Sequence, residues 1–356
     1  MTRWTTLVPV VAAVLLVATW GSKPPAAVLV LVGIVLAGAV LAAVHHAEVV
    51  AHRVGEPFGS IVLAVAVTVI EVGLIVTLMV SGTGEETATL ARDTVFAAVM
   101  ITCNGILGLC VIVGALRRRM AAFNAEGSAT ALATVCTLAT LTLVLPTFTE
   151  SAPGPEFTSS QLAFAAVASI ALYALFVFVQ AIRHRDYFLP VEEDAAHEGH
   201  AEPPSGSAAL SSLALLVLAL VAVVGLAKIE SPAIEDAVDA AGAPQSAVGV
   251  IIALLVLAPE TLAAVRNARR DRIQTSFNLA FGSAIASIGL TIPAIAVASI
   301  WVDGPLVLGL EPTQMVLLAI TAVVGALTVL PGRATLQEGG VHLVIFASFL
   351  FLAIRP

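Results

Sequence analysis

Two acidic residues stand inside stretches that are otherwise apolar for the length of a helix. Glu71 lies near the middle of PFGSIVLAVAVTVIEVGLIVTLMVS, residues 57–81, and Glu260 follows Pro259 in QSAVGVIIALLVLAPETLAAV, residues 245–265. An acid at bilayer depth is costly, so such residues are rare and mark ion or proton pathways. One acid in each half of the chain therefore predicts a cation site between the two halves.

Two carboxylates at such a site can hold a cation or protons at the same oxygen atoms. In a medium of low dielectric a lone carboxyl group takes up a proton, whereas a neighbouring cation keeps it ionised. No Lys or Arg is expected at the depth of Glu71 and Glu260, which favours a bound cation as the counter-charge. Competition between cation and proton is the physical basis of exchange. The alternative is that each acid forms a hydrogen bond inside the bundle and does nothing else.

Neutral oxygen donors accompany both acids. Thr68 precedes Glu71 by one helical turn, and Asn104 lies in the next apolar run among glycines. Ser283 and Ser287 occupy the run that follows Glu260. Hard cations prefer such oxygen ligands, so these four residues are candidates for the cation site. Each hydroxyl can instead bond a backbone carbonyl of its own helix, and that alternative stays open.

Composition identifies the class of protein. Hydrophobic residues make up 59% of the 356 residues, charged residues 11%, and the mean hydropathy is +1.03. These values are typical of a polytopic membrane protein embedded in a lipid bilayer. The net charge of −8 comes without a basic patch, which argues against nucleic acid as a partner. The three cysteines have no CxxC spacing, so neither a disulfide framework nor a metal site is expected.

Catalytic and cofactor motifs are absent from the sequence. It has no HExxH pair, no phosphate-binding GxxxxGK, and no Ser/His or paired-Asp arrangement at helical depth. We therefore expect no enzyme activity, no cofactor and no transport driven by ATP.

Apolar runs between polar, Gly or Pro clusters predict an all-α fold of eleven transmembrane helices. They lie at about 4–20, 26–50, 57–81, 94–116, 128–148, 158–182, 207–228, 246–267, 275–301, 312–330 and 337–354. The first run is short enough for a signal peptide, but ATWGSK makes a poor cleavage site, which favours a retained helix.

Positive charges predict the orientation. With eleven spans, twelve of the sixteen Lys and Arg residues fall on one side and four on the other. The twelve are Arg3, Arg53, Arg117, Arg118, Arg119, Arg183, Arg185, Arg266, Arg269, Arg270, Arg272 and Arg333. Positive residues concentrate on the cytoplasmic side. The N-terminus is therefore predicted to be cytoplasmic and the C-terminus outside, in a bacterial inner membrane.

The same count makes the two acid-bearing helices antiparallel, as in inverted repeats of five helices each. The predicted organisation is an N-terminal extra helix (1–25), a first repeat (26–182), an acidic cytoplasmic linker (183–206) and a second repeat (207–356).

The acid-bearing segments resemble a known family. GEPFGSIVLAVAVTVIEVGLI and LAPETLAAVRNARRDRIQTSFNLAFGSAIASIGLTIPA are similar to the two α-repeats of the calcium/cation antiporter (CaCA) superfamily. HHAEVVAHRVGEPFG, RDTVFA and the acidic linker extend the likeness to the bacterial ChaA-like calcium (sodium, potassium)/proton antiporters. The resemblance implies an inverted-repeat core in which Glu71 and Glu260 bind cations and protons, with Asn104 and the Gly282–Ser283 segment lining the site.

The sequence departs from the wider pattern of that superfamily. VTVIE and LAPE stand in place of the GN-x-x-E signature of calcium/proton exchangers, and Ala286 replaces a polar amide found in several relatives. This thinner ligand set leaves Na⁺ and K⁺ open beside Ca²⁺.

Weaker candidates lie nearer the helix ends. His45, His46 and Glu48 can gate the pathway or form a polar cluster at the membrane interface. Arg92 and Asp93 can pair at the outer mouth, or Asp93 can serve only the helix start. The linker acids and histidines can bind a regulatory cation or form a solvated loop. They are Glu192, Glu193, Asp194, His197, Glu198, His200 and Glu202.

These observations together predict a secondary antiporter that exports Ca²⁺, or alternatively Na⁺ or K⁺, in exchange for H⁺ by alternating access. The alternative class is a passive cation channel, which two buried acids alone permit. The sequence gives no indication of the oligomeric state.

Overall fold

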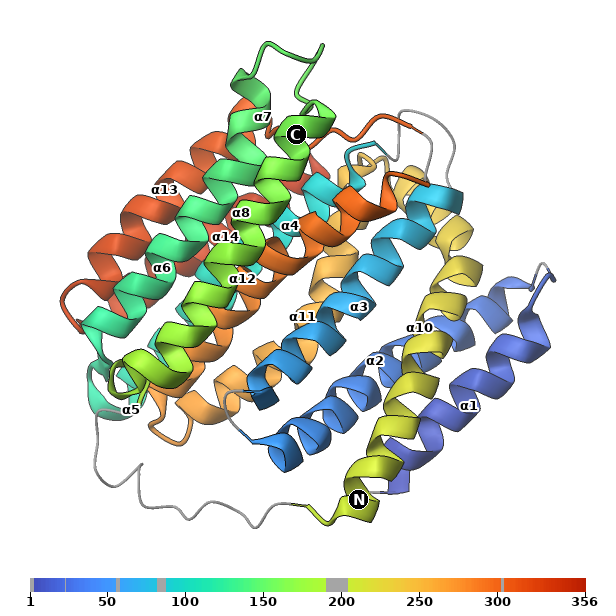
Figure 1. Ribbon diagram of the computed structural model, residues 1–356, viewed down its shortest axis with the longest axis horizontal. Coiled ribbons are helices and arrows are strands. Elements are labelled where there is room, and N and C mark those ends of the chain that lie inside the picture. The colour runs from blue at the N-terminus through green and yellow to red at the C-terminus, as the bar shows by residue number, and fades with distance from the viewer. Residues whose placement is uncertain (1–2, 23, 56–57, 82–87, 190–203, 302–303) are drawn as a thin grey trace.

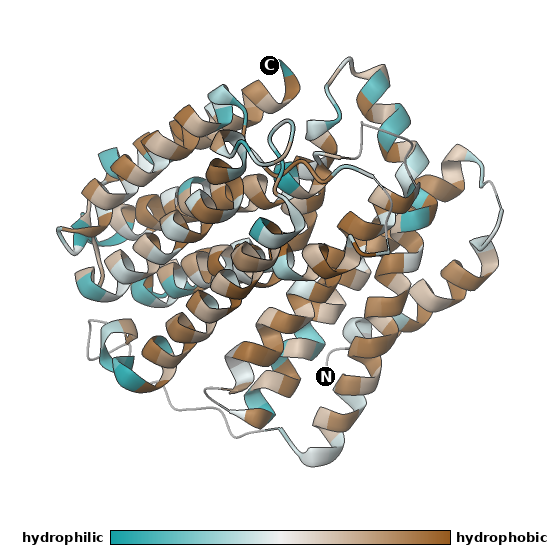
Figure 2. Ribbon diagram, turned by 45° about the horizontal axis from the view of Figure 1, so that its top comes forward, coloured by the Kyte–Doolittle hydropathy of each residue, from teal (hydrophilic) through white to brown (hydrophobic). Residues whose placement is uncertain are grey.

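The computed structural model describes residues 3–22, 24–55, 58–81, 88–189, 204–301 and 304–356 (Figure 1). Over these residues, ten helices are long and apolar enough to cross a membrane, and a shorter apolar helix covers Trp4–Thr19. The predicted all-α architecture of eleven helices is confirmed. Apolar residues predominate along the helices and polar residues gather near their ends (Figure 2), as expected for a multi-pass membrane protein.

In the described residues, the first half of the chain contains eight α-helices and a short 3₁₀ turn, besides the π-helical segments given below. They are α1 (Arg3–Thr19), α2 (Ala26–Val54), α3 (Phe58–Ser81), α4 (Leu90–Met100), α5 (Leu107–Arg118), α6 (Ala125–Ala139), α7 (Leu145–Phe148), α8 (Ser159–Phe178) and a short 3₁₀ turn, Arg185–Phe188. The second half contains α10 (Gly206–Ala240), α11 (Ser246–Ala268), α12 (Ile273–Ala298), α13 (Pro312–Val329) and α14 (Leu336–Ile354). A two-residue ribbon pairs β1 (Ala121–Ala122) with β2 (Arg333–Ala334).

Helix α10 is longer than the apolar pattern predicts. It was expected to end near residue 228 but continues to Ala240. Residues 229–240, IESPAIEDAVDA, carry four acids, so the apolar run stops there although the helix does not. Hydropathy locates the edge of the bilayer rather than the end of a helix. A 35-residue helix spans about 52 Å, well beyond a hydrocarbon core of about 30 Å.

Segments of π-helix interrupt three of the predicted continuous helices. Ile101–Ile106 joins α4 to α5, Thr140–Val144 joins α6 to α7, and Val179–Arg183 continues α8. A π turn adds one residue to the helical ring and shifts the direction in which later side chains point. The first of these segments contains Asn104.

The apolar side chains form two cores. The larger core is built mainly from α4 to α8 and α11 to α14. The smaller core is built from α1, α2, α3 and α10, together with one side of α11. Helix α11 contributes Leu257 to the larger core and Val256 to the smaller one, and α3 also contributes to both. The two acid-bearing helices therefore lie at the boundary between the two cores.

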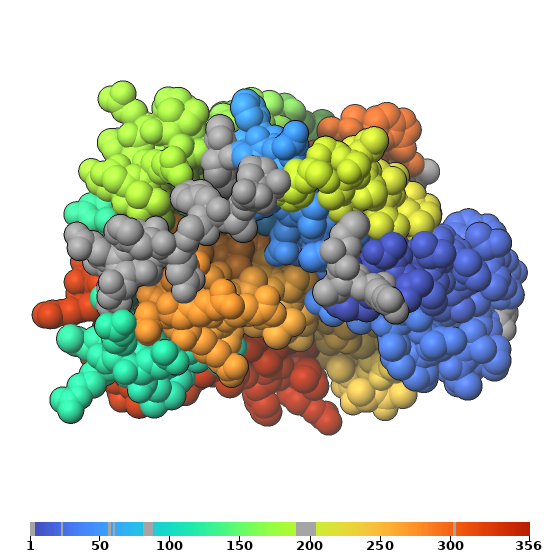
Figure 3. All heavy atoms as spheres, turned by 90° about the horizontal axis from the view of Figure 1, so that it is seen from below, coloured from blue at the N-terminus to red at the C-terminus, as the bar shows by residue number. Residues whose placement is uncertain are grey.

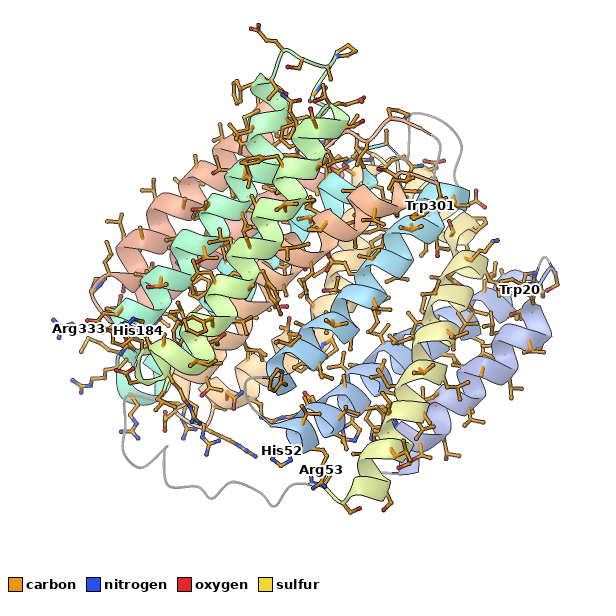
Figure 4. The ribbon with its side chains drawn as sticks, viewed as in Figure 1. Trp20, His52, Arg53, His184, Trp301 and Arg333 are labelled. Atoms are coloured by element: carbon orange, nitrogen blue, oxygen red, sulfur yellow. The ribbon has the colours of Figure 1, made fainter. Side chains whose placement is uncertain are left out.

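Helix pairs from the two halves run in opposite directions. In Figure 1, α3 and α11 lie next to each other with reversed chain direction, and so do α2 and α10. Several basic connections meet at one end of the bundle, where the ribbon joins Ala121 to Ala334 and Arg117 contacts Asp271. Arg53 and Arg333 point outward at this same end in Figure 4. We call it the basic end.

Candidate functional site

Glu71 is buried in the middle of α3, with 2% of its surface exposed. Its Oε2 accepts a hydrogen bond of 2.7 Å from the Ser287 hydroxyl on α12. The Thr291 hydroxyl lies next to the same carboxylate, one turn further along α12. The first half of the chain thus supplies the acid and the second half supplies the hydroxyls around it.

Glu260 is buried on α11, directly after Pro259, with 6% of its surface exposed. Proline has no N–H, so the carbonyl of Leu255, one turn earlier, lacks its usual helical partner. Glu260 is close enough to Glu71 and to Glu48 for their charges to interact. The structure therefore brings the two predicted acids together from antiparallel helices.

Several oxygens at this site have no hydrogen-bond partner among the described residues. They are Oε1 of Glu71, Oε2 of Glu260 and Oγ1 of Thr291, all buried. A buried polar atom without a partner costs roughly 1–3 kcal/mol, and more when it is charged. Carboxylate and hydroxyl oxygens can be satisfied together by a cation, or the carboxylates can be satisfied by protons.

A cavity of about 260 Å³ leads to Glu260. Ser283, Gly282 and Ala286 of α12 line it beside the acid. Apolar side chains of α3 and α8 form much of the remaining wall. Four uncharged polar residues lie toward the basic end, where α11 ends and α12 begins: Gln180, Asn267, Thr275 and Asn278. The surface of the molecule at this end is shown in Figure 3, where α11 and the start of α12 (orange) lie centrally.

At the opposite end, the buried Arg92 and Asp93 form a polar network with the exposed Glu311. Arg92 Nε donates to Asp93 Oδ1 at 2.8 Å, Arg92 Nη1 to the Gly309 carbonyl at 3.3 Å, and Arg92 Nη2 to Glu311 Oε1 at 3.2 Å. Gln314 Nε2 donates to the same oxygen of Asp93 at 3.1 Å. The Arg92–Asp93 pair that the sequence left open is thus present, and it joins α4 of the first half to the start of α13.

The predicted neutral ligands differ in where they lie. Ser287 contacts Glu71, and Ser283 lines the cavity. Thr68 is buried one turn before Glu71 but is not among the residues that line the cavity. Ala286, at which the sequence resemblance indicates a thinner ligand set, lies in the cavity wall. The sequence prediction missed Thr291, although its spacing of four residues from Ser287 places both on one helical face.

Asn104 belongs to a different buried cluster. Its Nδ2 donates to Thr321 Oγ1 at 2.9 Å, and its Oδ1 lies 3.0 Å from His342 Nδ1. Thr328 Oγ1 lies 3.0 Å from the other ring nitrogen of that histidine. Because an amide oxygen only accepts, His342 carries its proton on Nδ1 and accepts from Thr328. The structure thus directs the Asn104 side chain to α13 and α14, and its hydrogen bonds go to residues other than the two glutamates.

Of the weaker candidates, some lie in the described part of the chain and others do not. His46 Nε2 bonds the Thr5 carbonyl at 2.9 Å and so joins α2 to α1. The linker candidates Glu192 to His200, with Glu202, lie outside the described residues. Within the described part of the chain, no group of three or more His, Cys, Asp or Glu side chains could hold a metal ion.

The chain resembles known ion exchangers over nearly its whole length. The family model for sodium/calcium exchanger protein matches residues 25–182 and 211–355. The chain is 48% identical over 321 residues to a Sinorhizobium fredii protein described as an ionic transporter, covering 90% of this chain and 87% of that protein. It is 31% identical over 352 residues to the sodium-potassium/proton antiporter ChaA of Escherichia coli, covering 97% and 95%.

The fold matches solved structures as well. The structure of native YfkE, a Ca²⁺/H⁺ antiporter, superposes with a TM-score of 0.73 at 16% identity, covering 99% of this chain and 100% of that one. At this level of identity the match concerns the fold.

Proposed function

Because the chain belongs to the sodium/calcium exchanger protein family, a family of transporters, we propose that it is a secondary antiporter that exchanges Ca²⁺, Na⁺ or K⁺ against H⁺. Membership of an exchanger family favours this over the passive channel that the sequence left open. The relatives support both monovalent and divalent cations as candidates, since ChaA is a sodium-potassium/proton antiporter and YfkE is a Ca²⁺/H⁺ antiporter.

One observation carries the proposal: unpartnered oxygens of Glu71 and Glu260 are buried close together, and a cavity reaches Glu260. Either a cation or protons can satisfy these oxygens, but not both at once. If one divalent cation exchanges for two protons, the net charge at the two acids is the same in both states. One monovalent ion against one proton uses a single acid.

Neutral ligands complete the proposed site. Ser287 and Thr291 lie beside Glu71, while Ser283 lies on the cavity side near Glu260. Among the described residues, no hydrogen bond links Thr68 or Asn104 to either acid. In this proposal Thr68 supports the acid helix, and Asn104 positions the neighbouring helices instead of binding the ion.

The proposed transport cycle uses the two ends of the bundle in turn. The cavity faces the basic end, while the Arg92 network occupies the other end. The excess of arginine at the basic end favours a cytoplasmic location for it. We therefore propose an inward-facing arrangement in a bacterial inner membrane, with the N-terminus cytoplasmic and the C-terminus outside.

The proposed units are an extra N-terminal helix (1–25), repeats at 26–182 and 207–356, and a linker at 183–206. Two separate matches to one family model support the two-repeat division. In alternating access, each inverted repeat adopts the arrangement of the other, and the site then opens to the opposite side of the membrane.

Proton flux in everted membrane vesicles, energised to be acid inside, tests the proposal. Addition of Ca²⁺, Na⁺ or K⁺ in turn should release protons for at least one ion and so identify it. The response should disappear in Glu71→Gln and Glu260→Gln, whereas Glu126→Gln, at an exposed position of α6, should retain it. A full response in both buried-site variants would refute the proposal.

A further inference from the structure

Each half of the chain carries a second acid at an equivalent place on its first helix. Glu48 lies seven residues before Gly55, and Glu235 lies seven residues before Gly242. Both glycines have positive φ angles, 77° and 63°, and in each case a proline follows two residues later. A glycine in this conformation ends a helix sharply. Sequence and backbone thus align Glu48 with Glu235.

The two acids lie at opposite ends of the molecule. They occupy the last turns of α2 and α10, which pack closely and run in opposite directions (Figure 1). Glu48 is therefore at the basic end, one turn before His52 and Arg53 (Figure 4). This is the end toward which the polar part of the cavity extends.

The side chain of Glu48 is exposed, and it lies close enough to α11 for its charge to be felt there. Its charge acts on Arg266 of α11 and on Glu260. The neighbouring Ala47 is fully buried in the smaller core with Val256 of α11, which fixes this turn of α2 beside the acid-bearing helix. Glu235 is half-buried at the other end, where it accepts a hydrogen bond of 3.0 Å from Ser231.

We propose that Glu48 is an entry site for the transported cation at the basic end, toward which the cavity extends, and that Glu235 is its counterpart at the opposite end. This inference rests on the proposed function. An exposed carboxylate near a mouth raises the local cation concentration and the rate of cation entry. The nearby Arg266 would repel a cation, and Glu48 offsets that charge while offering oxygens on the way to Glu260.

The first test measures cation-driven proton flux in everted vesicles, whose bath faces the cavity mouth in the proposed orientation. With Ca²⁺, Na⁺ or K⁺, whichever is active, Glu48→Gln should raise the half-saturating concentration about five- to tenfold and change the maximal rate little. Glu126→Gln, which removes another exposed acid at this end, should match the wild type. Equal half-saturation in Glu48→Gln and Glu126→Gln would overturn the inference.

A double variant separates an entry site from simple neutralisation of Arg266. If Glu48 only neutralises that arginine, Glu48→Gln combined with Arg266→Gln should recover wild-type half-saturation. An entry site predicts that the double variant remains weak, because the carboxylate oxygens are still missing. Glu48→Asp, which keeps the charge, should recover most of the affinity and shows that the variant proteins are folded.

Vesicle orientation tests the pairing of the two acids. Glu235→Gln should leave half-saturation unchanged in everted vesicles and raise it in right-side-out vesicles, whereas Glu48→Gln should do the reverse. Identical effects in both orientations would overturn the assignment to opposite mouths. Absence of cation-driven flux in the wild type would instead count against the proposed antiport itself, so the two failures are distinguishable.

Discussion

Two buried polar centres lie in this helix bundle, and they differ in how their atoms are satisfied. At the acid site, Glu71, Glu260 and Thr291 each keep an oxygen without a hydrogen-bond partner in the described structure. In the cluster around Asn104 and His342, the amide and both ring nitrogens are bonded, at 2.9–3.0 Å. The unpartnered oxygens of the first centre can bind a cation or protons. The polar atoms of the second centre are already hydrogen-bonded to other protein atoms.

Burial and polarity alone therefore do not identify a binding site. A centre that is complete without a ligand stabilises one packing arrangement. A centre with unpartnered oxygens is complete only with a ligand or protons. The position of Asn104 fits the first role. Gly108 and Gly339 bring α5 and α14 into close contact there, since an added Cβ at either would meet the other's carbonyl oxygen at 3.0–3.1 Å.

The largest predicted effect comes from neutralising the acids. Glu71→Gln and Glu260→Gln should each reduce cation-driven proton flux more than about 100-fold, because the exchanged charge is lost. The thermal unfolding temperature in detergent should change little or rise, since glutamine has nearly the same volume and cannot carry a buried charge. Asp239→Asn, at an exposed position of α10, is the matched control. Strong destabilisation by both substitutions would assign the acids a structural role.

Competition with protons should be the next largest effect. If cation and protons share the same oxygens, lowering the pH must raise the half-saturating cation concentration. Displacement of two protons gives a slope of up to about 100-fold per pH unit, and displacement of one proton gives about tenfold. The slope therefore distinguishes a divalent from a monovalent cycle. A half-saturation independent of pH would contradict a shared site.

The Asn104–His342 cluster should respond in stability instead. Asn104→Ala or His342→Ala should lower the free energy of unfolding by about 2–3 kcal/mol, because each leaves buried partners unsatisfied. The half-saturating cation concentration should stay within about twofold of the wild type. Thr137→Val, at an exposed threonine of α6, should have little effect on stability. A large loss of cation affinity without loss of stability would show that Asn104 binds the ion.

The sequence predicts the helices well and correctly indicates that both acids are buried, because each depends on local composition. Apolar runs locate most helix ends within a few residues, and Glu71 and Glu260 stand out because their neighbours are apolar. Antiparallel placement follows from counting spans and charges.

The direction of a side chain at a known depth is harder to predict. Asn104 lies at a suitable depth, but it sits in the π-helical segment Ile101–Ile106, which alters the helical register. Its partners Thr321 and His342 are more than 200 residues away in the sequence. Local periodicity carries no information about either, so the sequence alone cannot distinguish an amide that binds an ion from one that joins helices.

The smallest predicted effects come from two hydroxyls on α12, those of Ser287 and Thr291, of which one is hydrogen-bonded to Glu71 and the other has no partner in the described structure. Ser287→Ala removes the 2.7 Å hydrogen bond that stabilises the Glu71 carboxylate, and should weaken cation binding about three- to tenfold. Thr291→Val removes a hydroxyl that lies beside the Glu71 carboxylate and has no hydrogen-bond partner in the described structure, so it should weaken cation binding and leave stability unchanged. Isothermal calorimetry with the active cation, beside unfolding of the same samples, measures both. A loss of stability in Thr291→Val with unchanged cation binding would show that this hydroxyl serves the helix bundle and not the ion.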